Sequence, residues 1–121
     1  MQHKSSPGVL QGIRVYVAGP ISSDPEQGKL NALVVATKLR DAGHNPYVPH
    51  FSVDWDKLHP AEYETWMRIG SAWLEAADAV VVLPGESPGT DREVAIAREL
   101  GIPIFGSVRS LTDWASGEED E

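Results

Sequence analysis

The chain has 121 residues, of which 41% are hydrophobic and 23% charged, and it has no cysteine, which excludes disulfides, thiolate catalysis and cysteine-bound zinc. Its net charge of −8, from 10 basic and 18 acidic residues, argues against binding duplex nucleic acid, which requires Lys and Arg against the phosphates. No run of 18 apolar residues is present and the first eight residues lack the apolar core of a signal peptide, so we expect a cytoplasmic protein without membrane contact.

The length fits one compact domain with a single core. We expect a flexible N-terminus over residues 1–12 and one domain over residues 13–115. Residues 116–121 end in an acidic run and are expected to form a disordered tail, because a block of like charges is usually solvated.

The first half of the chain predicts two strands and a helix. Residues 13–18 are rich in β-branched side chains and end at Gly19 and Pro20, which indicates a strand that enters a turn. Apolar residues at near-helical spacing over 30–39 predict a helix, stopped by a glycine. A short second strand over 47–49 and a loop rich in aromatic and acidic residues follow.

The second half predicts further alternation of helices and strands. Residues 79–83 are continuously apolar, which is typical of a strand buried on both faces of a parallel sheet. The expected helices cover residues 63–77, 90–100 and 110–115, and the expected strands cover 79–83 and 102–105. This alternation predicts an α/β sandwich with a mostly parallel sheet.

In such sheets, ligands bind at the carboxyl ends of the strands, near a topological switch point. Three segments leave those ends, at residues 19–22, 49–60 and 84–93. We therefore expect any functional site to be built from these segments.

Glu93 is the first candidate for chemistry. Its spacing from Thr90 fits a capping box at a helix N-terminus, in which both side chains bond to the backbone. Alternatively, Glu93 faces the sheet at the mouth of the site, ionised in the first helical turn. Such a carboxylate can attack or stabilise a cationic sugar carbon. The pattern leaves both interpretations open.

Two turns beside the expected site also have two interpretations. Ser87 and Gly89 fit either a plain turn or an anion cradle at the N-terminus of a helix. Ser23 or Asp24 fits a helix cap better than a ligand contact.

The segment 49–60 combines aromatic and acidic residues, a mixture that suits stacking on and hydrogen bonding to a nucleobase, although a surface loop would fit as well. His50, Asp54 and His59 have no recognised metal-ligand spacing, and we expect neither metal nor cofactor. Asp78 precedes a strand and fits either a buried polar partner or an ordinary helix-end residue.

The order and spacing of several segments resemble the nucleoside 2-deoxyribosyltransferase-like superfamily, most closely its small, often phage-encoded members. The resemblance covers about residues 13–105. The matching residues are 15–22, 48–50, 74–85, Ser87, Gly89, Glu93, Ala97 and 101–104.

The resemblance implies a flavodoxin-like or Rossmann-like fold with a four- to five-stranded, mostly parallel sheet, and a homo-oligomer that is a dimer or larger. It implies action on the N-glycosidic bond of nucleosides or nucleotides. Glu93 matches the family's nucleophile, which attacks the anomeric carbon before water or a second base resolves the intermediate, as in a retaining glycosidase.

Position 87 bears on the substrate. Members that act on free nucleosides carry an aspartate six residues before the glutamate, whereas members that hydrolyse nucleoside 5′-monophosphates carry a serine, as this chain does at Ser87. Related phosphoribohydrolases share a P-G-G-x-G-T-x-x-E segment, of which residues 84–93 are a loosened version. Both similarities imply a monophosphate substrate.

The sequence departs from the family at two positions. The family's catalytic aspartate in the second helix is Gly70 here, and an arginine that grips phosphate in some relatives is Ser22. The acid must then come from elsewhere, with His50, Asp54 or Asp56 as candidates, or catalysis is lost. The candidate catalytic residues are therefore Glu93, Asp54 and Asp78.

These observations predict hydrolysis of the N-glycosidic bond of a nucleoside or 2′-deoxynucleoside 5′-monophosphate, which releases the free base and a sugar 5-phosphate. The alternatives are a nucleoside 2-deoxyribosyltransferase and a nucleotide-binding module without turnover. The expected substrate-binding residues are Tyr16, Gly19, Pro20, Ser22, His50, Phe51, Trp55, Gly85, Ser87, Gly89 and Thr90.

Overall fold

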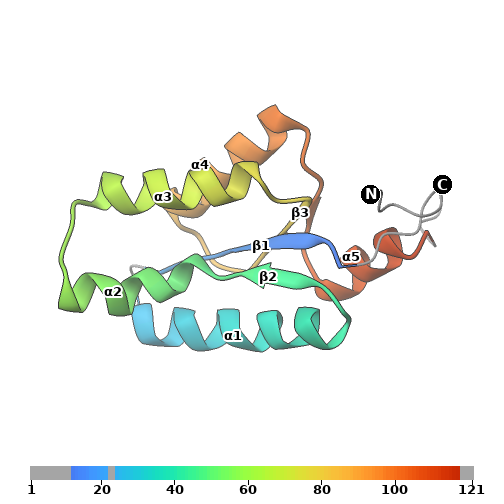
Figure 1. The fold of residues 1–121 in the computed structure, drawn as a ribbon, viewed down its shortest axis with the longest axis horizontal. Helices are drawn as coiled ribbons and strands as arrows, with labels where there is room; N and C mark the ends of the chain where they lie inside the picture. The colour runs from blue at the N-terminus through green and yellow to red at the C-terminus, as the bar shows by residue number, and fades with distance from the viewer. Residues whose placement is uncertain (1–11, 22–23, 118–121) are drawn as a thin grey trace.

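The computed structural model describes residues 12–21 and 24–117, which alternate between strands and helices (Figure 1). The strands are β1 (Arg14–Ala18), β2 (Asn45–Tyr47), β3 (Ala79–Val82) and β4 (Ile104–Phe105). The helices are α1 (Pro25–Asp41), the 3-10 turn η1 (Pro49–Phe51), α2 (Ser52–Leu58), α3 (Tyr63–Glu75), α4 (Pro88–Leu100) and α5 (Val108–Ala115). Most of the expected flexible N-terminus and acidic tail, and Ser22, lie outside the described residues.

The four described strands form one parallel sheet in the order β2-β1-β3-β4. Tyr16 pairs with Tyr47 on one side and with Val80 on the other, so β1 lies at the centre. The chain moves outward from β1 to β2 and then returns to β3 beside β1, which makes the β1–β3 boundary the topological switch point. The predicted α/β sandwich with a four- to five-stranded, mostly parallel sheet is confirmed.

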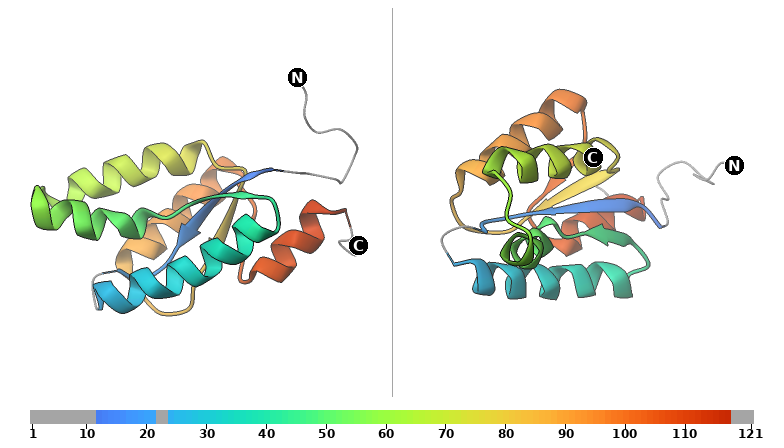
Figure 2. Two further views of the ribbon diagram at one scale, coloured as in Figure 1. Left: turned by 60° about the horizontal axis from the view of Figure 1, so that its bottom comes forward. Right: turned by 60° about the vertical axis from the view of Figure 1, so that its left-hand side comes forward.

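Helices cover both faces of the sheet (Figure 2). On one face, Val15 and Val17 of β1 pack with α1 and α5, where Leu39 and Leu111 are fully buried. On the other face, Tyr16 packs with residues of α3 and α4. Successive residues of a strand point to opposite faces, so β1 and β3 contribute to both cores, as their apolar sequences require. In the described part of the chain, no helix is long and apolar enough to cross a membrane.

The structure corrects the prediction for residues 47–60. The second strand ends at Tyr47, because Pro49 begins the turn η1, and Pro46 is tolerated within β2 because this is an edge strand. The expected loop contains the helix α2, which has no buried residue. Side-chain contacts to α1 and α3 stabilise α2, and such distant contacts leave no periodic apolar pattern in its own sequence.

Gly19 allows the ends of the two central strands to approach each other. It follows β1, and a Cβ atom at this position would lie 2.7 Å from Leu83 Cδ1, at the end of β3. Any larger residue would therefore push the strand ends apart at the switch point.

Candidate active site

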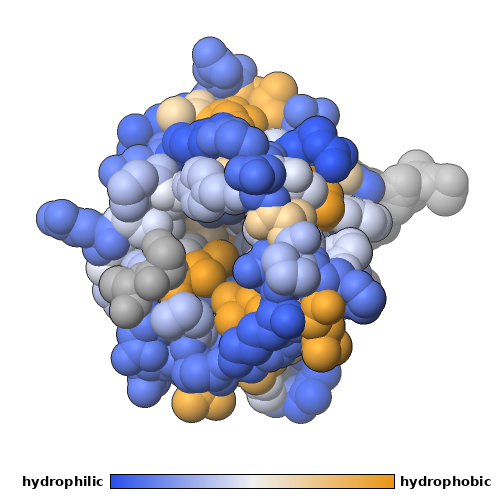
Figure 3. All heavy atoms as spheres, turned by 90° about the vertical axis from the view of Figure 1, so that its left-hand side faces the viewer, coloured by the Kyte–Doolittle hydropathy of each residue, from blue (hydrophilic) through white to orange (hydrophobic). Residues whose placement is uncertain are grey.

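A cavity of about 960 Å³ lies at the carboxyl ends of the strands, near the upper limit for small-molecule sites. This face of the molecule is hollowed, and hydrophobic side chains gather in and around the hollow (Figure 3). All three predicted segments contribute to it. The predicted site residues that line the cavity are Tyr16, Gly19, Phe51, Trp55, Asp56, Ser87, Gly89, Thr90 and Glu93.

The carboxyl group of Glu93 lies at the inner wall of the cavity and is almost completely buried, with 8% of the residue exposed. Its Oε2 atom accepts a hydrogen bond of 2.6 Å from the hydroxyl of Tyr16 in β1. The two side chains come from opposite sides of the switch point. This contact joins residues that are 77 positions apart in the sequence.

Burial raises the pKa of Glu93 to about 7, although the hydrogen bond from Tyr16 and the charge of Arg92 oppose this effect. The prediction that the first helical turn keeps Glu93 ionised is therefore wrong, because α4 begins at Pro88 and Glu93 lies in its second turn. Burial also raises the pKa of Tyr16, so its phenol stays protonated and donates to the carboxylate.

The N-terminus of α4 borders the same cavity. Ser87, not Thr90, caps the helix: its Oγ accepts from the N–H of Thr90 at 3.3 Å, so the capping box of Thr90 and Glu93 is wrong. The hydroxyl of Thr90 is buried and has no hydrogen-bond partner among the described residues. A helix N-terminus with unused N–H groups and two hydroxyls is suited to an anion.

Gly70 of α3 faces the pair of Tyr16 and Glu93. A Cβ atom at position 70 would lie 2.9 Å from the Tyr16 hydroxyl and 4.0 Å from Glu93 Oε2. The missing side chain thus leaves room for the hydroxyl of Tyr16.

Aromatic side chains form the outer part of the cavity. Phe51 and Trp55 are about half exposed, and the ring of Trp55 meets that of Trp66 edge-on, with centroids 4.9 Å apart. Asp56 lies beside them and accepts from the indole N–H of Trp66 at 2.8 Å and the backbone N–H of Ala61 at 2.9 Å. These two donors lower the pKa of Asp56, first the backbone N–H and then the indole.

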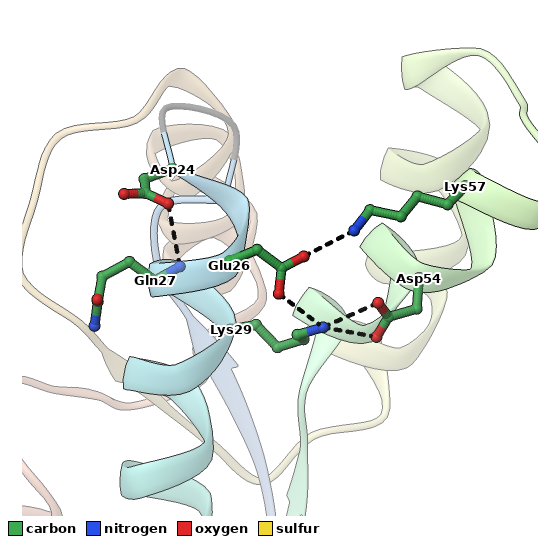
Figure 4. A network of polar contacts seen from close by, with 6 residues as sticks. All are labelled: Asp24, Glu26, Gln27, Lys29, Asp54 and Lys57. Atoms are coloured by element: carbon green, nitrogen blue, oxygen red, sulfur yellow. Dashed lines mark hydrogen bonds and ion pairs between the residues drawn. The ribbon is translucent and has the colours of Figure 1, made fainter.

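Ion pairs connect α2 to α1 (Figure 4). Lys29 donates to both carboxylate oxygens of Asp54, at 2.9 and 3.0 Å, and Lys57 donates to Glu26 at 2.8 Å. Asp54, predicted to be catalytic, therefore points toward α1 and does not line the cavity.

Asp78 also lies away from the cavity. It precedes β3 at the amino ends of the strands, where its Oδ2 accepts from the backbone N–H of Arg14 at 2.8 Å and its Oδ1 pairs with the Arg14 guanidinium at 3.2 Å. Of its two open interpretations, the structure supports the polar partner. The predicted catalytic role would require Asp78 at the opposite end of the sheet.

Three other predicted binding residues, His50, Pro20 and Gly85, do not line the cavity. His50 is fully buried without lining the cavity, and burial lowers its pKa to about 4, although hydrogen bonding to the backbone of Gly19 and Pro20 opposes this effect. Gly85, with a φ of 111°, packs against Pro20, and neither lines the cavity. Asp24 caps α1, as predicted. No three potential metal ligands lie together in the described part of the chain.

Sequence reasoning missed several residues of the cavity wall. They lie on β2 and on one face of α3, and they are Tyr47, Tyr63, Trp66 and Met67. The apolar stripe of α3 favours a core helix or a dimer face. The helix begins directly after the segment 49–60, which is predicted to contribute to the site, and this position indicates that the apolar stripe also faces the cavity.

Three solved structures share this fold. A 2-deoxyribosyltransferase from Leishmania mexicana is 20% identical with a TM-score of 0.59, and the match covers 76% of this chain and 61% of that one. A conserved protein from Enterococcus faecalis is 20% identical with a TM-score of 0.61, covering 79% and 62%. A 2-deoxyribosyltransferase from Bacillus psychrosaccharolyticus is 23% identical with a TM-score of 0.55, covering 84% and 81%.

The matched region thus spans less than two thirds of the first two structures. The chain has the fold of the 2-deoxyribosyltransferases, which confirms the fold that the resemblance in the sequence implied. The chain belongs to the family described as a domain of unknown function (DUF4406), whose model matches residues 13–106. No curated protein is significantly similar in sequence.

Proposed function

We propose that the protein hydrolyses the N-glycosidic bond of a nucleoside 5′-monophosphate, with Glu93 as the nucleophile. The observation that carries this proposal is the buried carboxylate of Glu93, fixed by the hydroxyl of Tyr16 at 2.6 Å on the wall of a cavity. The shared fold of the 2-deoxyribosyltransferases supports glycosyl chemistry at this place.

In the proposed reaction, an Oε atom of Glu93 bonds to C1′ of the sugar while the C1′–N bond breaks and its electron pair leaves with the base. Water then attacks C1′, the C1′–O bond of the ester breaks, and the carboxylate is restored. The base left with the electron pair of the C1′–N bond, so it takes up the proton that the water gives up. The hydrogen bond from Tyr16 holds the carboxylate of Glu93 in one orientation. A fixed orientation lowers the entropy cost of the attack on C1′.

The 5′-phosphate would bind at the N-terminus of α4. Ser87 and Thr90 offer hydroxyls there, and the N–H of Gly89 belongs to the first helical turn, which has no internal acceptors. Thr90 Oγ1, buried without a described partner, would gain one from the ligand. The aromatic rings of Phe51 and Trp55 would stack on the base.

The test is base release from a panel of ribo- and deoxynucleoside 5′-monophosphates, followed by chromatography. Glu93→Gln keeps the size and a hydrogen-bond acceptor for Tyr16 but removes the nucleophile. Glu99→Gln, an exposed residue of the same helix, is the matched control. We expect release by the wild type and by Glu99→Gln only. Equal release by Glu93→Gln contradicts the mechanism, and intact ligand bound without turnover indicates a binding module.

A second candidate function is 2-deoxyribosyl transfer, which is favoured by the shared fold of two solved 2-deoxyribosyltransferases. The same glycosyl ester would then react with a second base instead of water. Adding a second free base to the reaction distinguishes the two functions, because a transferase forms the new nucleotide faster than it releases free sugar phosphate.

A further inference from the structure

We infer that the cavity selects N-glycosides whose leaving base already carries a positive charge, such as a pyridinium or an N7-alkylated purine nucleotide. This inference rests on the proposed function and names its substrate class.

Both carboxyl groups of the cavity are placed as hydrogen-bond acceptors. Glu93 accepts from the hydroxyl of Tyr16, and Asp56 accepts from an indole and a backbone N–H. These donors stabilise the anionic form of Asp56, whereas burial raises the pKa of Glu93 to about 7, so that Glu93 is only partly ionised at neutral pH. Asp56 therefore presents negative charge to a ligand, and Lys57, the one cationic side chain of the described cavity wall, donates a hydrogen bond from its ammonium group to Glu26 of α1.

The walls suit a flat cation. Trp55 and Trp66 meet edge-on beside Asp56, and Phe51 lies half exposed in the same outer wall. Aromatic faces attract cations, most strongly where water is excluded. A neutral base could stack on these rings as well, but only a cationic ring gains from both the rings and the carboxylate.

A cationic ligand would also help Glu93 to ionise. Burial holds the pKa of this carboxyl at about 7, so ionisation of the empty site is incomplete at neutral pH. A positive ring near C1′ favours the charged nucleophile, so binding and activation are coupled.

The described cavity offers no strong acid to protonate a leaving base. Its ionisable side chains are Tyr16, Tyr47, Asp56, Lys57, Tyr63 and Glu93. Asp56 is held as an anion by its two donors, and phenols are weak acids at neutral pH. Lys57 donates to Glu26 of α1, and Glu93 must be ionised to attack C1′. At position 70 a side chain would collide with the hydroxyl of Tyr16.

A cationic base needs no acid. When the C1′–N⁺ bond breaks, its electron pair neutralises the ring nitrogen, and the base leaves uncharged. Glu93 forms the C1′–O bond, water later replaces it, and one proton is released per turnover. The step balances with water as the only co-reactant.

The experiment compares matched nucleotides that differ in this charge. The pairs are 7-methylguanosine 5′-monophosphate against guanosine 5′-monophosphate, the 2′-deoxy forms of both, and nicotinamide mononucleotide against its dihydro form. Each rate is corrected by a blank without protein and repeated with Glu93→Gln. General acid catalysis contributes about 10²–10⁴-fold, so without it kcat/KM for the cationic member should be higher by about 100-fold or more.

A second variant tests the binding part of the inference. Asp56→Asn keeps an oxygen acceptor for Trp66 but removes the charge, and tryptophan fluorescence reports ligand affinity without turnover. We expect weaker binding of the cationic nucleotide and unchanged binding of the neutral one. An equal effect on both overturns the inference.

The outcomes separate the inference from the function on which it rests. Glu93-dependent release of neutral bases at an equal or higher rate overturns the inference and leaves the proposed hydrolase intact. Silence with every nucleotide of the panel overturns both.

Discussion

The hydroxyl of Tyr16 occupies space that a side chain at position 70 would need: a Cβ atom there would lie 2.9 Å from it. Gly70 and Tyr16 therefore form one unit, in which the glycine of α3 permits the hydrogen bond between β1 and Glu93. The identity of residue 70 thus bears on the position of the Glu93 carboxyl group.

Gly70→Ala tests this unit. Replacing glycine by alanine inside a helix usually stabilises a protein by about 0.5–1 kcal/mol. Here we expect no such gain and a loss of base release of about tenfold or more, because Tyr16 must move away from Glu93. Gly106→Ala is the control, since a Cβ there meets nothing within 4 Å. Unchanged activity in Gly70→Ala contradicts the expected displacement.

Tyr16→Phe should shift the pH dependence of base release. Attack requires ionised Glu93, so wild-type kcat/KM for a neutral nucleotide should rise with pH through about 7. Loss of the hydroxyl removes a donor that lowers this pKa, and the rising limb should move about one unit higher. The measurement is a pH–rate profile from pH 5 to 9. Identical limbs in the two proteins would show that the hydrogen bond does not tune Glu93.

Glu93→Gln should stabilise the fold at neutral pH. The pKa of Glu93 is raised in the folded state, so the unfolded chain ionises first, and stability is lost as pH rises from the ordinary value near 4.5 to about 7. The variant lacks this loss, so its free energy of unfolding should exceed that of the wild type by about 3 kcal/mol above pH 7, and the two values should converge below pH 4. Urea unfolding at both pH values checks this, and a pH-independent difference contradicts it.

Lys29→Met should loosen α2. Lys29, with a side chain only 16% exposed, joins Glu26 of α1 to Asp54 of α2. Trp55 of α2 lines the cavity. We therefore expect the variant to have a several-fold higher KM with little change in kcat. Lys38→Met, an exposed position of the same helix, is the control. Equal KM values for the two variants would show that these ion pairs do not position the wall.

Asp78→Asn should affect stability rather than chemistry. Asp78 pairs with Arg14 at the amino ends of the strands, whereas the cavity lies at their carboxyl ends. We expect a slightly lower thermal unfolding temperature and unchanged base release, since an amide still accepts from the backbone N–H of Arg14. A large loss of activity without loss of stability would restore Asp78 as a catalytic residue.

The sheet could be predicted because its signals are local. The apolar run over 79–83 and the β-branched run over 13–18 mark strands buried on both faces, and the glycines and prolines around them mark their ends. Since carboxyl ends of parallel strands share one edge, the three segments of the cavity wall followed from chain order alone.

The helix α2 and the roles of the acids could not be read in the same way. Asp54 and Asp56 lie two residues apart, yet one pairs with Lys29 on α1 and the other accepts from Trp66 on α3. Asp78 and Glu93 look alike as candidates, yet they lie at opposite ends of the strands. These differences depend on partners distant in the sequence, which no local pattern encodes.

By itself, the sequence determined the order of strands and helices and the edge of the sheet that carries the cavity, and it indicated Glu93 as the first candidate for chemistry. Only the tertiary structure decided that Glu93 is buried against Tyr16, that its pKa is raised to about 7, and that Gly70 makes this contact possible. The reason is physical: strand formation and chain order follow from short-range preferences, whereas burial and hydrogen bonding depend on atoms that folding brings from 77 positions away.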